Sequence, residues 1–421
     1  MTGAALRIGV AGMTHLGLVT ATAFAAKGFE TLCYDADAGL AARLAAGDLP
    51  VVEPGLAEAL RTNGTRQRFT ADVDSLAACD IVYVAPDVPT DSQGRSDLAG
   101  VRALALRAFA ALAPQALLVV LCQVPPGFTR GLGLPPARVF YQVETLVFGE
   151  ALARAASPER FIVGTADSAA ALPEAYSTLL GAFGCPVLTM RYESAELAKI
   201  AINFCLVASV SVTNTLGELA EKIGADWHEI VPALKLDRRI GPHAYLAPGL
   251  GIAGGNLERD LETVAGLAAR HGTDAGIVAA WRANSRRRRD WVYDRFPDDL
   301  RRRGTVGILG LAYKPDTAST RNSPSLALIA RLGPGRVRVH DPAADPACAA
   351  GAAVCDDPYA VADGADALAV MTPWPLYRML DPARLAARMR QRLLFDPYGA
   401  VDPAAAAAAG FVHHRLGRPA P

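Results

Sequence analysis

Residues 6–17 read LRIGVAGMTHLG, and residues 31–35 read TLCYD. The first stretch is a short apolar run that leads into a turn bounded by Gly12 and Gly17. Helical periodicity runs from Leu18 to about Lys27, and the second apolar run ends at Asp35. The order strand, glycine turn, helix, strand and acidic residue is typical of a dinucleotide-binding βαβ unit. We therefore expect a Rossmann-like domain at the N-terminus.

The glycine turn is suited to bind NAD. Gly12 permits a tight turn, Gly17 lets the helix pack closely on the strand, and the first helical turn directs backbone N–H groups at a pyrophosphate. Asp35 is placed to accept hydrogen bonds from a ribose diol, and it favours NAD over NADP because it would repel a 2′-phosphate. Turns of this kind usually follow the fingerprint G-x-G-x-x-G, and Thr14 holds the position of its middle glycine. A Rossmann-type fold that binds no dinucleotide therefore stays open as an alternative.

A related pattern recurs near the C-terminus. Residues 305–315 read TVGILGLAYKP, an apolar run followed by a glycine turn. A helix is predicted over about 324–332, and a strand over 336–340 ends at Asp341. The region between the two patterns, roughly 190–290, has long apolar helical periodicity.

The predicted fold class is therefore α/β, with two Rossmann-like domains joined by a central helical region. The expected domains are 1–190, which binds NAD, 191–290, which is helical, and 291–421, a second α/β domain. A length of 421 residues agrees with two or three domains.

The composition is that of a globular protein, with 51% hydrophobic and 20% charged residues. Its 42 lysine and arginine residues balance 42 acidic ones, which argues against nucleic acid or an anionic membrane as a partner. We see no apolar run of about 20 residues that would span a membrane, and no secretory signal, so a cytoplasmic protein is expected. Seven cysteines without CxxC pairs predict reduced thiols and no metal site.

The central region carries the candidate chemistry. Residues 194–212 are apolar on nearly every side and predict a buried helix. Glu196, Lys199 and Asn203 follow at i, i+3 and i+7 along one stripe of it. Burying such groups is costly unless they are paired or face a polar site. A Glu196–Lys199 ion pair at the surface is the alternative.

A glycine-rich loop follows the central helix. Residues 248–260 read PGLGIAGGNLERD, and such a loop brings backbone close to a ligand and reorients the chain sharply. Asp260 is predicted to open the next helix. Taken alone, the segment also fits an ordinary flexible loop.

Over essentially its whole length, and in the same order of motifs, the chain resembles the UDP-glucose/GDP-mannose 6-dehydrogenase family. The matching segments are GRSDL at 94–98, VPPG at 124–127, Glu144 with Gly149, PERFIVG at 158–164, Glu196-x-x-Lys199-x-x-x-Asn203, RIG at 239–241, and GLAYKP at 310–315 with Arg321 and Ser323-Pro324. The resemblance implies an N-terminal sheet that is mostly parallel and binds NAD, a long central dimerisation helix, and a C-terminal domain that holds a nucleotide sugar.

Members of this family oxidise the C6 hydroxyl of a nucleotide sugar to a carboxylate with two NAD+, and an active-site cysteine holds the intermediates covalently. By position, the resemblance assigns oxyanion stabilisation to Lys199 and Asn203, water positioning to Asp260, and assistance in thioester hydrolysis to Glu144. It implies a homodimer in which Arg239 reaches the partner's site. The expected cofactor contacts are Gly12, Thr14, Leu16, Gly17, Asp35, Pro89 and Arg321. The expected substrate contacts are Arg239, Tyr245, Gly251 and Lys314.

The chain departs from the family at catalytic positions. Asn256 stands where the family has its nucleophilic cysteine, and an amide cannot form a thiohemiacetal because its nitrogen lone pair is delocalised. Arg259 replaces a lysine of the same loop, Gln123 a threonine after Cys122, and Val88 the threonine of a Thr-Pro pair. The standard four-electron mechanism is therefore not expected.

Three functional hypotheses follow. The first is an NAD-dependent oxidoreductase that acts at C6 of a UDP- or GDP-sugar by altered chemistry. That chemistry is a two-electron step, oxidation without covalent capture, or transient oxidation and re-reduction that gives an epimer. The second is a catalytically inactive pseudoenzyme that binds a nucleotide sugar. The third is an ordinary 6-dehydrogenase with another nucleophile. For that role Cys122 is a better candidate than Cys205, which lies two positions past Asn203 and points away from the polar stripe.

Overall fold

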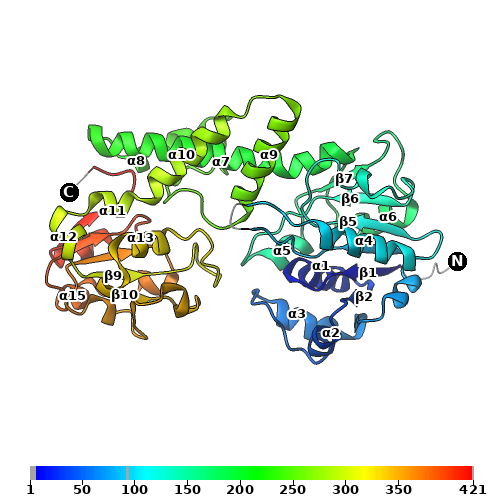
Figure 1. Cartoon of the computed structure of the whole chain (residues 1–421), viewed down its shortest axis with the longest axis horizontal. Helices are drawn as coiled ribbons and strands as arrows, with labels where there is room; N and C mark the ends of the chain where they lie inside the picture. Colours follow the sequence, from blue (N-terminus) through cyan, green and yellow to red (C-terminus); the bar gives the residue numbers. More distant parts are fainter. Residues whose placement is uncertain (1–5, 92–93, 420–421) are drawn as a thin grey trace. The chain divides into compact units, whose positions relative to one another are not determined.

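The computed structural model describes residues 6–91 and 94–419 of the chain (Figure 1). The chain divides into two compact units, Met1–Ile202 and Asn203–Pro421, called unit 1 and unit 2 below. Each unit contains one extended sheet in which most neighbouring strands run parallel. The α/β fold class predicted from the sequence is confirmed. The three domain boundaries given above stay a prediction.

The sheet of unit 1 has eight strands in the order β3-β2-β1-β4-β5-β6-β7-β8. Every neighbouring pair is parallel except β6 and β7, so the predicted, mostly parallel sheet is confirmed. Its strands are β1 (Arg7–Ala11), β2 (Glu30–Tyr34), β3 (Gln67–Thr70), β4 (Ile81–Val84), β5 (Leu117–Val120), β6 (Val139–Gln142), β7 (Phe161–Thr165) and β8 (Val187–Arg191). The inner strands are continuous apolar runs because helices cover both faces of such a sheet.

The first βαβ unit forms as the sequence predicts. Helix α1 (His15–Ala26) joins β1 to β2, which pair in parallel with Val10 opposite Cys33. The helix begins three residues before the predicted start at Leu18. The other helices of unit 1 are α2 (Ala38–Ala45), α3 (Leu56–Asn63), α4 (Ala99–Ala111), α5 (Ala151–Ala156) and α6 (Glu174–Gly181).

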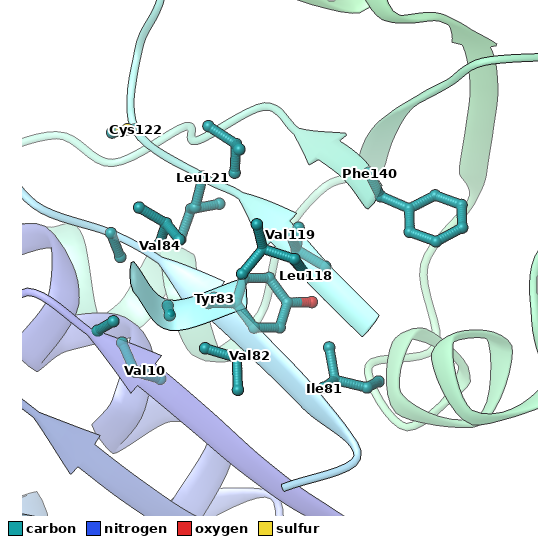
Figure 2. Close-up of a cluster of buried hydrophobic side chains, with 14 of the residues drawn as sticks. Val10, Ile81, Val82, Tyr83, Val84, Leu118, Val119, Leu121, Cys122 and Phe140 are labelled. Atoms are coloured by element: carbon teal, nitrogen blue, oxygen red, sulfur yellow. The ribbon is translucent and has the colours of Figure 1, made fainter. Parts of the chain in front are cut away.

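The core of unit 1 is centred on β4 and β5 (Figure 2). Val84, Leu118 and Val119 are fully buried there, together with the ring of Tyr83. The Tyr83 hydroxyl donates to Gln142 Oε1 at 3.0 Å, because a buried polar group needs a partner. This packing holds β1 beside β4, so the turns that follow these strands lie at the same edge of the sheet.

Helix α7 (Tyr192–Ile223) leads from unit 1 into unit 2. Residues 194–212 predict burial on nearly every side, but this prediction is wrong for Leu197 and Val212, which are 48% and 56% exposed. Beyond this segment, Leu216, Leu219 and Ile223 are between 43% and 66% exposed. Among the residues that the structure describes, α7 is the helix long and apolar enough to cross a membrane, a test that the core helix of a soluble protein also passes. This apolar run contradicts the expectation that no segment of the chain is long and apolar enough to span a membrane.

Unit 2 contains a six-stranded parallel sheet with the order β11-β10-β9-β12-β13-β14. Its strands are β9 (Val306–Leu309), β10 (Val337–His340), β11 (Ala353–Val354), β12 (Ala367–Val370), β13 (Leu393–Phe395) and β14 (Val412–His414). Its helices are α8 (Trp227–Leu236), α9 (Asn256–His271), α10 (Gly276–Arg289), α11 (Trp291–Arg295), α12 (Asp298–Arg303), α13 (Pro324–Leu332), α14 (Pro375–Arg378), α15 (Pro382–Ala386) and α16 (Pro403–Ala408). The second βαβ unit, β9-α13-β10, matches the predicted segments to within one residue.

Candidate active site

The glycine turn after β1 has the geometry of a dinucleotide-binding turn. Gly12 has φ +95°, a conformation that glycine adopts without strain, and its N–H donates to Tyr34 O at 2.9 Å. A Cβ on Gly17 would lie 1.9 Å from Gly12 O, so only glycine lets α1 approach the turn this closely. Asp35 follows β2, and its Oδ2 accepts from Met13 N at 2.8 Å. These residues fit the ribose and turn portions of NAD.

The phosphate end of the turn is different. Backbone N–H of His15, the first residue of α1, donates to Asp87 Oδ2 at 3.1 Å. The Thr14 hydroxyl accepts from Asp87 N at 2.7 Å. Leu16 is buried in the core, so it offers a ligand its backbone only. Pro89, two residues past Asp87, accepts from Asp97 N through its carbonyl.

Glu53 and Phe148, which both contact the His15 ring, were not predicted from the sequence. The buried Glu53 lies 2.9 Å from His15 Nε2 through Oε2 and accepts from Ala151 N at 2.8 Å through Oε1. The His15 ring stacks on Phe148 at 4.5 Å. The available signal is an acidic residue directly before Pro54 and Gly55, which is weak without the fold.

Glu196 on α7 is a structural residue. It is fully buried and accepts from Gly127 N at 2.5 Å and from Thr129 N at 2.8 Å. Burial raises the pKa of its carboxyl, although these backbone donors oppose the shift. The alternative of a Glu196–Lys199 ion pair at the surface is therefore wrong.

Lys199, one turn further along α7, pairs with Glu144 instead. Its Nζ lies 2.7 Å from Glu144 Oε1, and both side chains are largely buried. Glu144 Oε2 also accepts from Leu146 N at 2.9 Å, which fixes the orientation of the carboxylate. Unit 1 thus brings together two of the predicted catalytic residues, a cation and a carboxylate.

Unit 2 brings together the other predicted pair. Asn203, four residues after Lys199 on α7, donates through Nδ2 to Asp260 Oδ2 at 2.5 Å, and both side chains are buried. Asp260 lies on α9, and its Oδ1 is 3.7 Å from Nε of the buried Arg259. The positive charge of Arg259 balances the negative charge of the buried Asp260 carboxylate, as the lysine that it replaces would.

Helix α9 starts at Asn256, not at Asp260, and Asp260 lies one turn inside it. The prediction that Asp260 opens the helix is therefore wrong, because Gly255 ends the glycine loop and the helix continues from the next residue. Asn256 is exposed in the first turn. Asn256, which the resemblance aligns with the family's cysteine, thus lies at a helix N-terminus, where partial positive charge favours developing anions.

Arg321 packs on the glycine loop. A Cβ on Gly255 would lie 2.9 Å from Arg321 Nε, and Gly254 N donates to Arg321 O at 3.0 Å. The neighbouring Asn322 donates through Nδ2 to Gly254 O at 2.8 Å and to Glu258. Burial raises the pKa of Glu258, against the nearby charge of Arg321. The structure places Arg321 beside the first turn of α9.

All four predicted substrate residues lie in unit 2, and each has its own surroundings there. Arg239 is exposed and pairs with Asp237 at 2.7 Å. Tyr245 is 53% exposed. Gly251 has φ +80°, and a Cβ there would lie 2.4 Å from Ser285 O, so the loop needs a glycine at this position. Lys314 lies in the loop between β9 and α13.

The two cysteines considered as alternative nucleophiles, Cys122 and Cys205, differ in exposure. Cys122 is fully buried beside the core of unit 1 (Figure 2). Cys205 is exposed on α7. Among the described residues, no three His, Cys, Asp or Glu side chains are grouped so that they could hold a metal ion.

Comparison with known proteins identifies the class. Three models of the UDP-glucose/GDP-mannose dehydrogenase family match the chain. They are the NAD binding domain at residues 6–180, the central domain at 193–286 and the UDP binding domain at 307–403. The chain belongs to this family, so it is an NAD-dependent oxidoreductase of the nucleotide-sugar dehydrogenase type, as the resemblance implies.

Individual relatives extend over nearly the whole chain. A UDP-glucose 6-dehydrogenase of Pseudomonas aeruginosa is 33% identical and covers 98% of both chains. UDP-glucose 6-dehydrogenase TuaD of Bacillus subtilis is 30% identical and covers 98% of this chain and 94% of its own. The solved structure of a UDP-glucose dehydrogenase from Pyrobaculum islandicum has a TM-score of 0.82 at 30% identity, over 94% of each chain.

Proposed function

We propose that this protein oxidises C6 of a UDP- or GDP-sugar with NAD+ and that the reaction proceeds without covalent capture of the aldehyde. The observation that carries the proposal is the buried ion pair between Lys199 and Glu144. A buried lysine is costly to maintain, and a protein that only bound a nucleotide sugar would not need it. Asn256 at the nucleophile position is the reason for the altered outcome.

The first oxidation needs a group that accepts the proton of the C6 hydroxyl. It also needs hydrogen-bond donors to the C6 oxygen. When bound, NAD+ supplies the acceptor for the hydride that leaves C6, so alcohol and NAD+ become aldehyde, NADH and a proton. Lys199 and Asn203 lie one turn apart on α7, and their N–H groups suit an oxygen on which negative charge develops. An amide nitrogen carries two N–H groups, and the bond to Asp260 uses one of those of Asn203.

The second oxidation is the step that Asn256 changes. A thiol would add to the aldehyde and give a species that can lose a second hydride, whereas the Asn256 amide is a poor nucleophile. The aldehyde is then released, or its hydrate is oxidised slowly. Asp260, held by Asn203 and close to Arg259, is the group best suited to orient water for hydration.

The alternative is a pseudoenzyme that binds a nucleotide sugar without turnover. Asn256 favours it, and so does the contact of Asp87 with the dinucleotide turn. Under that alternative the Lys199–Glu144 pair would serve stability alone.

Assembly and location complete the proposal. The exposed apolar stripe of α7, formed by Val212, Leu216, Leu219 and Ile223, suits a homodimer interface because such patches on soluble proteins are usually covered. Arg239 is exposed, and in the homodimer we expect it to contact the substrate of the partner chain. A cytoplasmic location fits an enzyme that uses NAD and nucleotide sugars.

The test is the amount of NADH formed per molecule of sugar consumed, over a panel of UDP-, GDP- and dTDP-sugars, with the product identified by mass. We expect one NADH and an aldehyde for the wild-type protein. Asn256→Cys should shift the outcome toward two NADH and a carboxylate. Lys199→Ala should lower kcat by about 10³-fold, whereas Lys222→Ala, an exposed lysine on the same helix, should not.

Each result decides between the hypotheses. Two NADH from the wild-type protein would contradict the role given to Asn256. If Cys122→Ser then abolished the acid product, an alternative thiol would be responsible. Absence of NADH with every sugar, while a nucleotide sugar still binds, would establish the pseudoenzyme. Turnover that survives Lys199→Ala would remove the oxyanion role of that residue.

A further inference from the structure

We propose that Asp87 is an internal competitor of the dinucleotide. Its carboxylate caps the N-terminus of α1, where this fold otherwise offers N–H groups to a pyrophosphate, so NAD must displace it to bind. The proposal concerns binding alone and holds whether or not the chemistry at C6 takes place.

The contact uses a donor that the helix itself cannot satisfy. Helix α1 begins at His15, and the N–H of Leu18 already donates within the helix, to Thr14 O at 3.0 Å. The His15 N–H therefore belongs to the first turn, which has no internal acceptor, and Asp87 Oδ2 accepts it at 3.1 Å. A carboxylate has the negative charge and the acceptor oxygens of a phosphate, and the positive end of the helix favours either group.

The segment that carries Asp87 is fixed on both sides. Ala85 N donates to Ala11 O at 2.9 Å, and Asp97 N donates to Pro89 O at 2.9 Å. A Cβ on Gly12 would lie 2.9 Å from Pro86 N, so the segment also lies directly against the turn. The carboxylate of Asp87 is therefore held at the helix by its backbone.

The side chain of Thr14 holds the backbone of Asp87 in place. The Thr14 hydroxyl accepts from Asp87 N at 2.7 Å, and a glycine at this position would have no hydroxyl to offer. Thr14 itself makes no side-chain hydrogen bond that caps α1, so the capping carboxylate comes from the segment after β4. The threonine that replaces the middle glycine of the fingerprint thus anchors the acid that occupies the phosphate end of the turn.

A second carboxylate adds to the effect. Asp35 Oδ2 accepts from Met13 N at 2.8 Å, so two N–H groups of the turn, those of Met13 and His15, already donate to carboxylates of the chain. A bound pyrophosphate would meet the negative charge of Asp87 at close range. This repulsion is screened by salt, so higher ionic strength should tighten NAD binding to the wild-type protein.

The experiment is calorimetric titration of the full chain with NAD+, ADP-ribose and adenosine. Asp87→Asn removes the charge, and Asp87→Gly removes both the charge and the cap. We expect Asp87→Gly to bind NAD+ and ADP-ribose about ten-fold more tightly and Asp87→Asn to lie between it and the wild type. Adenosine has no phosphate, so its affinity should not change. Glu30→Gln, which removes an exposed carboxylate at the opposite end of β2, is the matched control and should bind like the wild type.

Several outcomes would overturn the proposal. Unchanged or weaker NAD+ binding in Asp87→Gly would do so, provided that its far-ultraviolet circular dichroism matches the wild type. If Glu30→Gln bound NAD+ as tightly as Asp87→Gly, the gain in affinity would come from net charge alone. If Asp87→Gly also bound adenosine more tightly, the gain would not arise at the phosphate. If neither the wild type nor Asp87→Gly binds NAD+, Asp87 is not what limits binding. A Thr14→Gly variant should tighten binding in the same direction, because it releases the Asp87 backbone.

Discussion

The two βαβ units of this protein share a frame but differ in how their acidic residues are used. In both, a strand is followed directly by a glycine of positive φ, Gly12 at +95° and Gly310 at +97°, whose N–H donates to the carbonyl of the last residue of the neighbouring strand. In both, an aspartate follows that neighbouring strand and accepts from the turn, Asp35 in unit 1 and Asp341 in unit 2. Because both units share this glycine turn and this aspartate, these two features do not determine which unit binds a dinucleotide.

The aspartates differ in the number of their donors. Asp341 accepts from four backbone N–H groups, those of Leu311, Ala312, Ala343 and Ala344, and lies 3.2 Å from Trp374 Nε1. Burial alone would raise the pKa of Asp341, but these donors together lower it below its usual value. Asp35 accepts from two backbone N–H groups, Met13 and Asp37. Asp341 therefore joins segments of unit 2, whereas Asp35 keeps acceptor capacity for a ribose.

The two units also differ in the number of residues between the glycine turn and the start of the helix. In unit 1 the helix starts three residues after Gly12, and Gly17 lies against Gly12 O. In unit 2 a loop of thirteen residues separates Gly310 from α13, and the Ser325 hydroxyl donates to Gly310 O at 2.7 Å. The long loop carries Lys314. The close helix start suits a phosphate, and the long loop suits a larger ligand.

The largest effect is expected for Gly17→Ala. Its Cβ would lie 1.9 Å from Gly12 O, and because both partners are backbone, the strain cannot relax by a side-chain rotation. We expect a loss of about 3 kcal/mol or more in the stability of unit 1, seen by calorimetry as a transition at lower temperature. Gly100→Ala is the control, because that glycine lies in α4 with no atom near its Cβ position. A wild-type melting temperature for Gly17→Ala would refute the close approach.

The next effect separates the two acids. Asp341→Asn replaces one acceptor oxygen by a donor amide among four backbone N–H groups, so about 2–3 kcal/mol of stability should be lost. Asp35→Asn should cost about 1 kcal/mol of stability but weaken NAD+ binding by about ten-fold. Thermal unfolding and NAD+ titration of both variants provide the measurement. The comparison fails if Asp341→Asn impairs NAD+ binding more than Asp35→Asn does.

The strands, glycines and terminal acids of both units could be predicted because each follows from local periodicity and backbone sterics. The pairing of polar groups could not. Glu196 and Lys199 lie on one helical stripe, yet Glu196 binds backbone at Gly127 and Lys199 pairs with Glu144. Those partners are more than 50 positions away, and only the fold brings them near. The role of Asp87 was missed for the same reason, since its contact with His15 spans 72 positions.

The smallest effect concerns acid sensitivity, which we expect in unit 2. Burial lowers the pKa of His340, against the nearby charge of Asp341, and its Nδ1 lies 2.9 Å from the Tyr377 hydroxyl. Burial also lowers the pKa of His414. Because the folded pKa of each is below the unfolded value of 6.5, the unfolded chain binds more protons, and stability is lost as the pH falls through that value.

Between about pH 7 and pH 5 the loss should be on the order of 1 kcal/mol per histidine. Melting curves across this range should therefore show a falling transition temperature for unit 2. His340→Asn keeps an N–H for the Tyr377 hydroxyl but cannot titrate, so it should flatten part of the slope. His271→Asn, at the exposed end of α9, should leave the slope unchanged. A slope that is the same in His340→Asn and the wild type would show that other groups determine the acid sensitivity of unit 2.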